Sequence, residues 1–324
     1  MYFIIGFLVL VYISYRLYQH FFPSPDINPT GKYVLISGCD TGFGYGLAIE
    51  LDKQGFNVFA GIYNPNNKDK LTSILSSRAT VFKLDITQTE DIDLAYEMIS
   101  SKTKVLYALV NNAGVGSYGY IDWISVDSIR QVMDVNFFGH VTMTKKFLPL
   151  LIMRKDSRVV NICSVAGFIS APGMVSYNCS KYALESFSDC LRREMSIWDL
   201  RVSIIEPGFM KTAIVEGHDK TLHVLWNELE NDVKDRWGEE HLVKQVEELS
   251  NNLLIKFAEN PNKVINALKH AVMNTKPQIR YRPGWQSNVM FVLSQCPAWL
   301  VDFAINKFNT GAITPIGARN QLKD

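Results

Sequence analysis

A tyrosine and a lysine four residues apart carry the clearest chemical signal in the chain. Of the 14 tyrosines, only Tyr177 has a lysine, Lys181, four positions later. On a helix these positions share a face, so phenol and ammonium project into the same space. A free phenol has a pKa of about 10, and a nearby cation favours its ionised form. The pair therefore indicates acid–base chemistry at an oxygen, with Ser164, at the end of an apolar run, able to hold that oxygen.

A glycine-rich segment, Ser37-Gly38-Cys39-Asp40-Thr41-Gly42-Phe43-Gly44, lies between an apolar run and a run with helical periodicity. Glycines at such a point let the chain turn tightly and let backbone N–H groups approach a pyrophosphate at a helix N-terminus. Tight turns use glycine freely, so the cluster alone is weak evidence. Its position between a strand and a helix favours a dinucleotide-binding loop.

Two kinds of segment alternate through the body of the chain and must position these residues. Short runs rich in Val, Ile and Leu predict buried strands at Tyr33–Ser37, Asn57–Ile62, Thr80–Leu84, Leu106–Val110, Arg158–Ser164 and Arg201–Glu206. Helical periodicity predicts helices at Gly44–Gln54, Glu90–Ser100, Ser128–Arg154 and Val175–Ser196. This alternation predicts an α/β fold, a single doubly wound (Rossmann) domain with a parallel sheet and helices on both faces.

These motifs, in this order, resemble the short-chain dehydrogenase/reductase superfamily over residues 32–285. The spacing Gly-x3-Gly-x-Gly is that of the family's loop, with Ser37 in place of the usual threonine. Asn111-Asn112-Ala113-Gly114 matches the family's NNAG, and Tyr177-x3-Lys181 matches its active-site pair. The resemblance implies an NAD(P)-dependent short-chain alcohol dehydrogenase acting on CH–OH groups.

The resemblance also implies four catalytic residues. Tyr177 is expected to be the general acid/base, Lys181 to bind the nicotinamide ribose and tune Tyr177, and Ser164 to orient the substrate. Asn136 matches the residue that holds a proton-relay water beside the lysine. Without the resemblance, an asparagine inside a helix indicates packing or a kink.

The cofactor site follows from the same resemblance. Asp85 lies where the family contacts adenine, and Thr212 matches the residue that contacts the carboxamide. No metal ligands are expected. The residues expected to bind the cofactor are Gly38, Gly42, Phe43, Gly44, Asp85, Ile86, Asn112, Ala113, Gly114, Tyr177, Lys181, Pro207, Gly208 and Thr212.

The choice between NAD and NADP depends on the residues after the second strand. An acid there usually binds the ribose hydroxyls of NAD, whereas NADP needs a cation for its 2′-phosphate. Tyr63-Asn64-Pro65-Asn66-Asn67 offers neither, and Lys68 comes late. Asp40 in the glycine loop disfavours an added phosphate, so NAD is preferred and NADP is the alternative.

The first 22 residues differ in character from the rest. Thirteen of the first 15 are hydrophobic and the first charge is Arg16. As a helix, residues 1–22 would be about 33 Å long, close to the ~30 Å hydrocarbon core of a bilayer. A signal peptide lacks support because no charge precedes the run, and a buried core helix is disfavoured by Pro23 and Pro25. We therefore predict a retained membrane anchor, with residues 23–31 as a linker. The body is expected in the cytosol because Arg16, His20 and Lys32 lie toward the C-terminal side of the apolar run.

Charge and cysteine content exclude other classes. The chain carries 33 Lys+Arg against 32 Asp+Glu, so nothing indicates a nucleic-acid partner. Composition also excludes disordered and small disulfide-stapled classes. The five cysteines lack the spacing of metal ligands, and reduced thiols are expected in a cytosol-facing protein.

The substrate region is expected within residues 209–260. Leu222, Leu225, Trp226 and Leu229 have helical spacing, which is typical of a core face and also suits a wall around an apolar alcohol. A second apolar stretch, Val289–Ile305, contains Pro297 and Asp302 and is a poor membrane span. Within the C-terminal segment 286–324, it is either an ordinary core helix or a membrane-dipping lining of the cleft mouth.

Longer motifs narrow the resemblance to the branch of membrane-bound retinol and hydroxysteroid dehydrogenases. They include Phe187–Glu194, Glu206–Phe209 and Arg280–Trp285. This implies an NAD(H)-preferring enzyme of the endoplasmic reticulum membrane, or alternatively a mitochondrial one, acting on a lipophilic alcohol or ketone, with a possible homodimer. One alternative is a 3-hydroxybutyrate-type hydroxyacid dehydrogenase of the same branch, for which Lys211 and His218 are the nearest cations. The other is a dinucleotide-binding scaffold without turnover.

Overall fold

In the computed structural model of the chain, residues 24–212, 218–308 and 314–321 are described, together with Gly6, Phe7, Leu10, Val11 and Ser14. The predicted anchor, residues 1–22, otherwise lies outside the described residues. Among the parts of the chain that are described, no helix is long and apolar enough to cross a membrane.

The centre of the molecule is a seven-stranded parallel sheet in the order β3-β2-β1-β4-β5-β6-β7. The six predicted strands are present with small differences at their ends, and the two-residue β7 was not predicted because it is too short to show a pattern. The strands are β1 Tyr33–Ile36, β2 Asn57–Ile62, β3 Thr80–Lys83, β4 Ala108–Asn111, β5 Arg158–Ile162, β6 Arg201–Ile205 and β7 Arg280–Tyr281.

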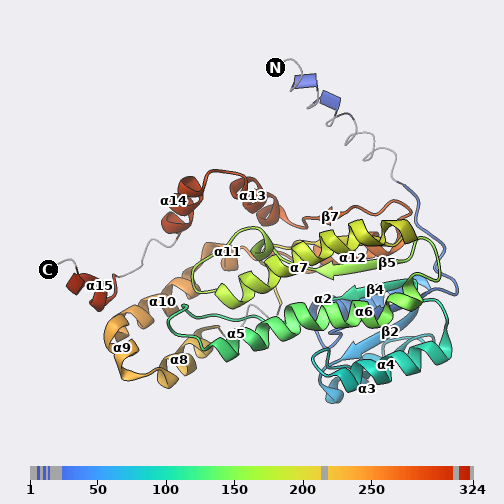
Figure 1. Ribbon diagram of the computed structural model, residues 1–324, viewed down its shortest axis with the longest axis horizontal. Helices are drawn as coiled ribbons and strands as arrows, with labels where there is room; N and C mark the ends of the chain where they lie inside the picture. Colours follow the sequence, from blue (N-terminus) through green and yellow to red (C-terminus); the bar gives the residue numbers. More distant parts are fainter. Residues whose placement is uncertain are drawn as a thin grey trace.

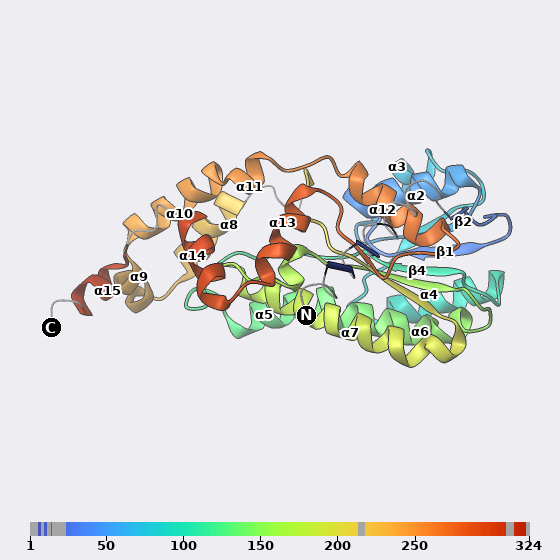
Figure 2. The same cartoon turned by 90° about the horizontal axis from the view of Figure 1, so that it is seen from above.

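Helices cover both faces of this sheet, as the alternating pattern predicted (Figures 1 and 2). α2 (Gly42–Gln54) and α12 (Asn262–Met273) pack on one face, where the core includes Leu47, Leu51 and Leu268. The other face carries α4 (Thr89–Lys102), α5 (Val126–Met133), α6 (His140–Leu151) and α7 (Val175–Glu194). The short α3 (Lys68–Thr72) follows β2.

The predicted helix over Ser128–Arg154 is interrupted rather than uniform. A π-helical turn, Asp134–Gly139, separates α5 from α6. Asn136 lies in this turn and is fully buried. Single π turns are frequent at functional sites, because the extra residue redirects side chains.

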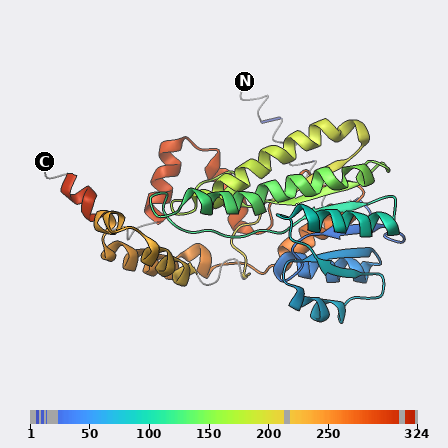
Figure 3. The same ribbon diagram turned by 60° about the horizontal axis from the view of Figure 1, so that its bottom comes forward.

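The remaining helices form an extension beyond the carboxyl edge of the sheet (Figure 3). The core of this extension is mainly aromatic, with Trp123 and Trp226 buried beside Leu242. The apolar helix face predicted on residues 222–229 therefore packs in a core. The helices are α8 His218–Glu228, α9 Asn231–Trp237, α10 Glu239–Asn251 and α11 Leu253–Lys256, followed after α12 by α13 Trp285–Ser294, α14 Ala298–Phe308 and α15 Ile316–Gln321.

The predicted linker is tied to the body over its described part. Ile27 N donates to Met273 O at 2.8 Å, and Asn274 Nδ2 donates to Ser24 O at 2.7 Å. Asp26 and Asn274 also form an antiparallel bridge. The prolines therefore end the apolar tract without leaving residues 24–27 detached, and this segment is held at the C-terminal end of α12.

Candidate active site

A cavity of about 1000 Å³ opens at the carboxyl ends of β1 and β4. The chain places β2 and β3 on one side of β1 and β4 to β7 on the other, so the connections diverge at this point. Ligands of open α/β sheets bind in the crevice that this reversal creates. Apart from Gly44 and Asn136, every residue predicted for catalysis or cofactor binding lines this cavity.

Two glycines of the predicted loop are required by close backbone packing. Gly38 has a φ of +71°, and a Cβ added there would lie 2.7 Å from Ala113 Cα. A Cβ on Gly44 would lie 2.4 Å from Asn112 Nδ2 and from Gly38 O. The N-cap residue of α2, Thr41, makes no side-chain capping hydrogen bond, and Thr41, Gly42 and Phe43 line the cavity at this helix N-terminus. The loop thus fits the pyrophosphate of a dinucleotide.

Ser37 joins the glycine loop to the NNAG segment. Its Oγ accepts hydrogen bonds from Asn112 N at 3.1 Å and from Ala113 N at 3.2 Å. Asn112 Nδ2 in turn donates to the carbonyls of Ser37 and Gly38, both at 2.9 Å. A serine hydroxyl is sufficient for these bonds, which accounts for its presence where the family usually has threonine.

Asp40 reaches from the glycine loop to the end of β2. Its carboxylate accepts from Tyr63 N at 2.7 Å, Asn64 N at 2.9 Å and Asn67 Nδ2 at 3.0 Å. All four residues line the cavity. The acidic group that the sequence lacks after the second strand is therefore supplied by the loop after the first strand.

Asp85 and Ile86 lie on the same half of the cavity. The Asp85 carboxylate accepts from Thr87 N at 2.9 Å and Thr87 Oγ1 at 2.7 Å, which fixes the turn after β3. Ile86 packs against Gly139, where a Cβ would lie 2.8 Å from its side chain. Glycine at 139 therefore lets the π turn approach the predicted adenine wall.

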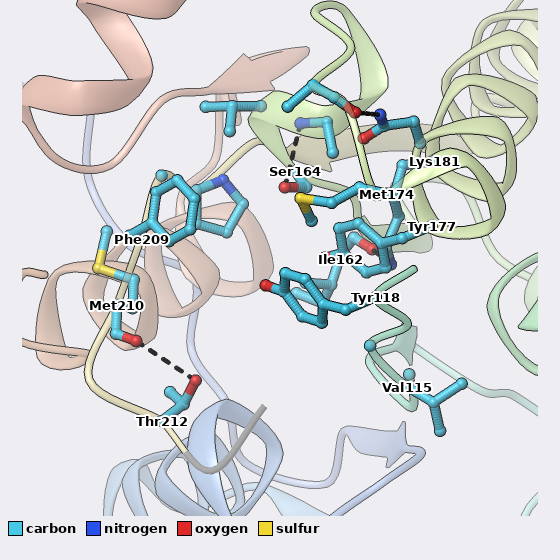
Figure 4. A pocket seen from close by; sticks show the side chains of 18 of the residues that line it. Val115, Tyr118, Ile162, Ser164, Met174, Tyr177, Lys181, Phe209, Met210 and Thr212 are labelled. Atoms are coloured by element: carbon cyan, nitrogen blue, oxygen red, sulfur yellow. Dashed lines mark hydrogen bonds between the residues drawn. The ribbon is translucent and has the colours of Figure 1, made fainter. Parts of the chain in front are cut away.

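Ser164 and Tyr177 come from different elements and meet at the cavity wall (Figure 4). Ser164 follows β5 as the N-cap of a 3-10 turn over Val165–Gly167, and its Oγ accepts from Ala166 N at 3.2 Å. Burial raises the pKa of the Tyr177 phenol, and its hydrogen bond with Ser164 acts in the opposite direction. The net shift is upward, opposite to the one expected from the lysine alone.

Lys181 lies one turn beyond Tyr177 on α7, as its spacing predicted. Its Nζ is 5.6 Å from the centroid of the Tyr177 ring and donates to Ile162 O at 2.9 Å. Burial lowers the pKa of this ammonium. The lysine is thus held against the sheet, with its charge beneath the phenol ring.

Asn136 acts on the backbone of the site rather than on the cavity surface. Its Oδ1 accepts from Val115 N at 2.8 Å, and its Nδ2 donates to Val115 O at 2.9 Å and to Ser180 Oγ at 3.1 Å. A Cβ on Gly114 would lie 3.3 Å from Asn136 Oδ1 and 3.8 Å from Lys181 Nζ. Asn136 and Lys181 therefore flank the same glycine.

The loop after β6 closes the opposite side of the cavity. Pro207, Gly208 and Thr212 line it, and Thr212 Oγ1 donates to Met210 O at 3.4 Å. Just before them, Glu206 is buried and pairs with Arg280 at 3.1 Å and Arg282 at 2.8 Å. Burial raises the pKa of this carboxyl to about 7. Arg280 and Arg282, which belong to the motif at 280–285, thus bind Glu206 at the start of the loop after β6.

Two cavity residues, Tyr118 and Met174, were not predicted. Tyr118 lies beside Tyr177 with Met174 nearby, and Phe209, which falls within the predicted substrate region 209–260, lies across the cavity (Figure 4). Burial raises the pKa of the Tyr118 phenol to about 12. No local pattern marks Tyr118 or Met174, because each comes from a separate loop or helix end.

The outer half of the cavity is mostly apolar. Its lining residues include Leu222, Leu249, Leu253, Leu254, Ile255, Met290, Leu293 and Ile305. α13 and α14 therefore contribute to the mouth of the cavity. Lys211, proposed as a cation for a small acid, is exposed and does not line it, and the side chain of His218 lies outside the described residues.

Comparisons with known proteins agree with this arrangement. A family model described as short chain dehydrogenase matches residues 32–223. The chain is 35% identical over 282 residues to 17-beta-hydroxysteroid dehydrogenase type 6 of Bos taurus, covering 85% of this chain and 88% of that protein. It is 37% identical over 283 residues to retinol dehydrogenase 5 of Homo sapiens, covering 86% and 88%. The relatives belong to the retinol and hydroxysteroid branch, as the motifs indicated.

Solved structures show the same fold. A short-chain dehydrogenase from Streptomyces avermitilis superposes with a TM-score of 0.69 at 24% identity, covering 89% of this chain and all of that one. A short chain dehydrogenase/reductase from Burkholderia phymatum in complex with NAD gives 0.69 at 19% identity, covering 90% and 99%. With the family model, the relatives and the glycine cradle, these matches show that the chain belongs to the short-chain dehydrogenase/reductase family and is an alcohol-dehydrogenase-type oxidoreductase.

Proposed function

We propose that this oxidoreductase transfers hydride between NAD(H) and a lipophilic alcohol or ketone of retinoid or steroid type. The observation that carries the proposal is the Ser164–Tyr177 pair, which faces a cavity bounded by the glycine loop on one half and by apolar side chains on the other. The printed names of the relatives, a 17-beta-hydroxysteroid dehydrogenase and retinol dehydrogenases, support this substrate class.

The catalytic step requires a proton acceptor at the substrate oxygen. A bound nicotinamide supplies the hydride acceptor for oxidation or the donor for reduction. Tyr177 takes the hydroxyl proton in oxidation. Burial favours its neutral phenol, and the hydrogen bond with Ser164 and the nearby ammonium of Lys181 act in the opposite direction, toward the phenolate. Ser164 holds the substrate oxygen beside the phenol. Burial of Tyr177 keeps water from competing for that proton.

The preference for NAD rests on Asp40. Its carboxylate accepts hydrogen bonds from three N–H donors at the end of β2. A 2′-phosphate there would meet this negative charge. Lys68 is exposed and does not line the cavity, and among the described lining residues the one cation is Lys181. The same shortage of cations disfavours a small hydroxyacid such as 3-hydroxybutyrate.

Membrane attachment is proposed through two regions. The apolar tract of residues 1–22 is the proposed anchor, with the body on the cytosolic face of the endoplasmic reticulum and a mitochondrial membrane as the alternative. On α13 and α14, Val292, Trp299 and Phe303 are exposed, while Met290 and Leu293 line the cavity mouth. A lipid surface at this face would deliver an apolar alcohol directly to the cavity.

A homodimer is part of the proposal. The two long helices that match the family's dimer faces, α6 and α7, lie side by side on the outside of the molecule (Figures 1 and 2). Phe138, in the π turn just before α6, and Tyr182, on α7, are exposed. Sedimentation of the detergent-solubilised protein tests this part.

The decisive assay gives the detergent-solubilised protein NAD or NADP with retinol, androstanediol or 3-hydroxybutyrate and follows reduced nicotinamide by absorbance. We expect turnover of at least one lipophilic alcohol, with NAD preferred. Turnover of 3-hydroxybutyrate alone would replace the substrate class. Binding of NAD(H) without turnover of any alcohol or ketone would favour the hypothesis of a dinucleotide-binding scaffold. The presence of Asn136, Ser164, Tyr177 and Lys181 argues against that hypothesis.

A further inference from the structure

Among the described residues that line the cavity, four are aspartate, glutamate or lysine: Asp40, Asp85, Lys181 and Glu248. The first three have assigned positions in the cofactor half, where each is bonded to backbone groups. Glu248 stands apart from them, on α10 in the outer half. Its neighbours on that wall include Leu249, Leu253 and Leu254 together with Gln245, Asn251 and Asn252, so apolar and uncharged polar side chains surround the carboxylate.

The carboxylate of Glu248 is only partly compensated. Its Oε2 accepts a 3.0 Å hydrogen bond from Gln245 Nε2, a residue that also lines the cavity. Its Oε1 is enclosed and has no hydrogen-bond partner among the described residues. The adjacent Lys244 pairs with Glu247 at 3.3 Å instead. With a single hydrogen bond from Gln245, the carboxylate keeps acceptor capacity for a donor on a ligand that enters the cavity.

Glu248 lies near Tyr120, a residue that also lines the cavity. The negative charge of Glu248 adds to burial in raising the pKa of the Tyr120 phenol to about 12. Tyr120 packs on Trp123 and Trp237 in the aromatic core of the helical extension. Glu248 therefore lies near the aromatic core of the extension, on an element that contributes neither Ser164 nor Tyr177.

We propose that Glu248, oriented by Gln245, is the specificity-determining residue that binds a hydroxyl group at the end of the substrate remote from the reacting alcohol. The inference rests on the proposed function and narrows its substrate class to apolar diols, such as dihydroxysteroids, over alcohols with a single oxygen. A carboxylate only accepts hydrogen bonds, so a remote hydroxyl can donate to it, whereas a remote ketone offers a second acceptor and is rejected.

The test compares two substrates that differ only at the remote oxygen. Androstane-3α,17β-diol has a remote hydroxyl and androsterone a remote ketone. We expect the wild-type enzyme to have the higher kcat/KM for the diol. Glu248→Gln should lower the ratio of the two kcat/KM values about tenfold or more, because the amide can donate to the ketone. Glu247→Gln, at the neighbouring exposed carboxylate, should leave the ratio unchanged.

Three further readouts separate the possible failures. NADH affinity, measured by fluorescence, should be equal in all variants, which shows that each is folded. Retinol has no remote hydroxyl, so its kcat/KM should change less than twofold in Glu248→Gln. An unchanged diol-to-ketone ratio in Glu248→Gln, or retinol turnover with no steroid turnover, would overturn this inference and leave the proposed function standing. Absence of turnover with all three alcohols would overturn both.

Discussion

Asn136 and Val115 exchange two hydrogen bonds, Val115 N to Asn136 Oδ1 at 2.8 Å and Asn136 Nδ2 to Val115 O at 2.9 Å. The same amide donates to Ser180 Oγ, which donates at 2.7 Å to the backbone carbonyl of Tyr177. One buried side chain in a π-helical turn thus joins the segment after β4 to the helix that carries the acid–base pair.

Replacing Asn136 should therefore disturb both segments at once. Asn136→Asp keeps the acceptor for Val115 N but places a carboxylate oxygen against Val115 O and removes the donor to Ser180. We expect a stability loss of about 1–3 kcal/mol, the cost of unsatisfied buried polar groups, and at least a tenfold lower kcat/KM. Urea unfolding and steady-state kinetics measure these. Asn262→Asp, at an exposed helix start, is the matched control, and equal losses in both variants would contradict the assigned role.

Tyr177→Phe should remove turnover without removing cofactor binding. The ring keeps its packing and its position over Lys181, while the proton acceptor is lost, so kcat should fall by about 100- to 10,000-fold. NADH fluorescence should give an unchanged Kd. Tyr182→Phe, on the exposed side of the same helix, should behave as wild type. Wild-type turnover in the Tyr177 variant would rule out the proposed mechanism.

Asp40→Asn tests the choice of cofactor. The amide oxygen can still accept from Asn64 N and Asn67 Nδ2, the bond from Tyr63 N is lost, and the charge that opposes a 2′-phosphate is gone. We expect the ratio of kcat/KM for NADP over NAD to rise about tenfold, which corresponds to about 1.4 kcal/mol. Asp69→Asn, an exposed change on α3, should not alter the ratio. An unchanged ratio in Asp40→Asn would mean that another residue determines the preference for NAD over NADP.

His140 predicts acid sensitivity. The ring is fully buried, bonds through Nε2 to Ala113 O at 2.8 Å, and has its pKa lowered to about 3, chiefly by burial. The unfolded chain binds a proton at about pH 6.5 and the folded one does not, so stability falls as pH drops from about 6.5 toward 3. The slope attributable to His140 is about 1.4 kcal/mol per pH unit.

The His140 contribution is isolated by difference. The free energy of unfolding of wild type minus that of His140→Gln should fall between pH 6.5 and pH 4.5, measured by urea titration. His223→Gln, at an exposed histidine, is the matched control for the substitution itself. A pH-independent difference for His140→Gln would mean that the ring is not held neutral in the folded protein.

The apolar face of α13 and α14 predicts membrane binding independent of the first 22 residues. A variant lacking residues 1–22 should still float with phosphatidylcholine vesicles. Adding Trp299→Ser and Phe303→Ser, which are 70% and 60% exposed, should release it at least tenfold. Equal flotation with and without the two serines would assign the face another role. The same serine changes placed at exposed Leu94 and Ile197, on other faces, serve as control.

The sequence alone determined the strand order along the chain, the glycine loop and the Tyr177–Lys181 pair. These features are local: alternating apolar runs define strands, and a spacing of four residues defines a helix face. The parallel, doubly wound sheet predicted from the sequence is confirmed. The prediction succeeds because a helix between two strands returns the chain to the start of the sheet, so that the next strand runs parallel. The family membership that the motifs indicated is likewise confirmed.

Only the tertiary structure determined the contacts between segments that are far apart in the sequence. Asp40 completes the end of β2 although it follows β1, because neighbouring parallel strands bring their carboxyl ends together. The π turn places Asn136 against Val115, and α10 brings Glu248 to the cavity that α7 opens. Such contacts depend on how helices pack over tens of residues, and no spacing in a single segment encodes them. The glycine loop and the Tyr177–Lys181 pair could therefore be predicted from local sequence and Asn136 from the family resemblance, whereas the substrate wall depended on packing.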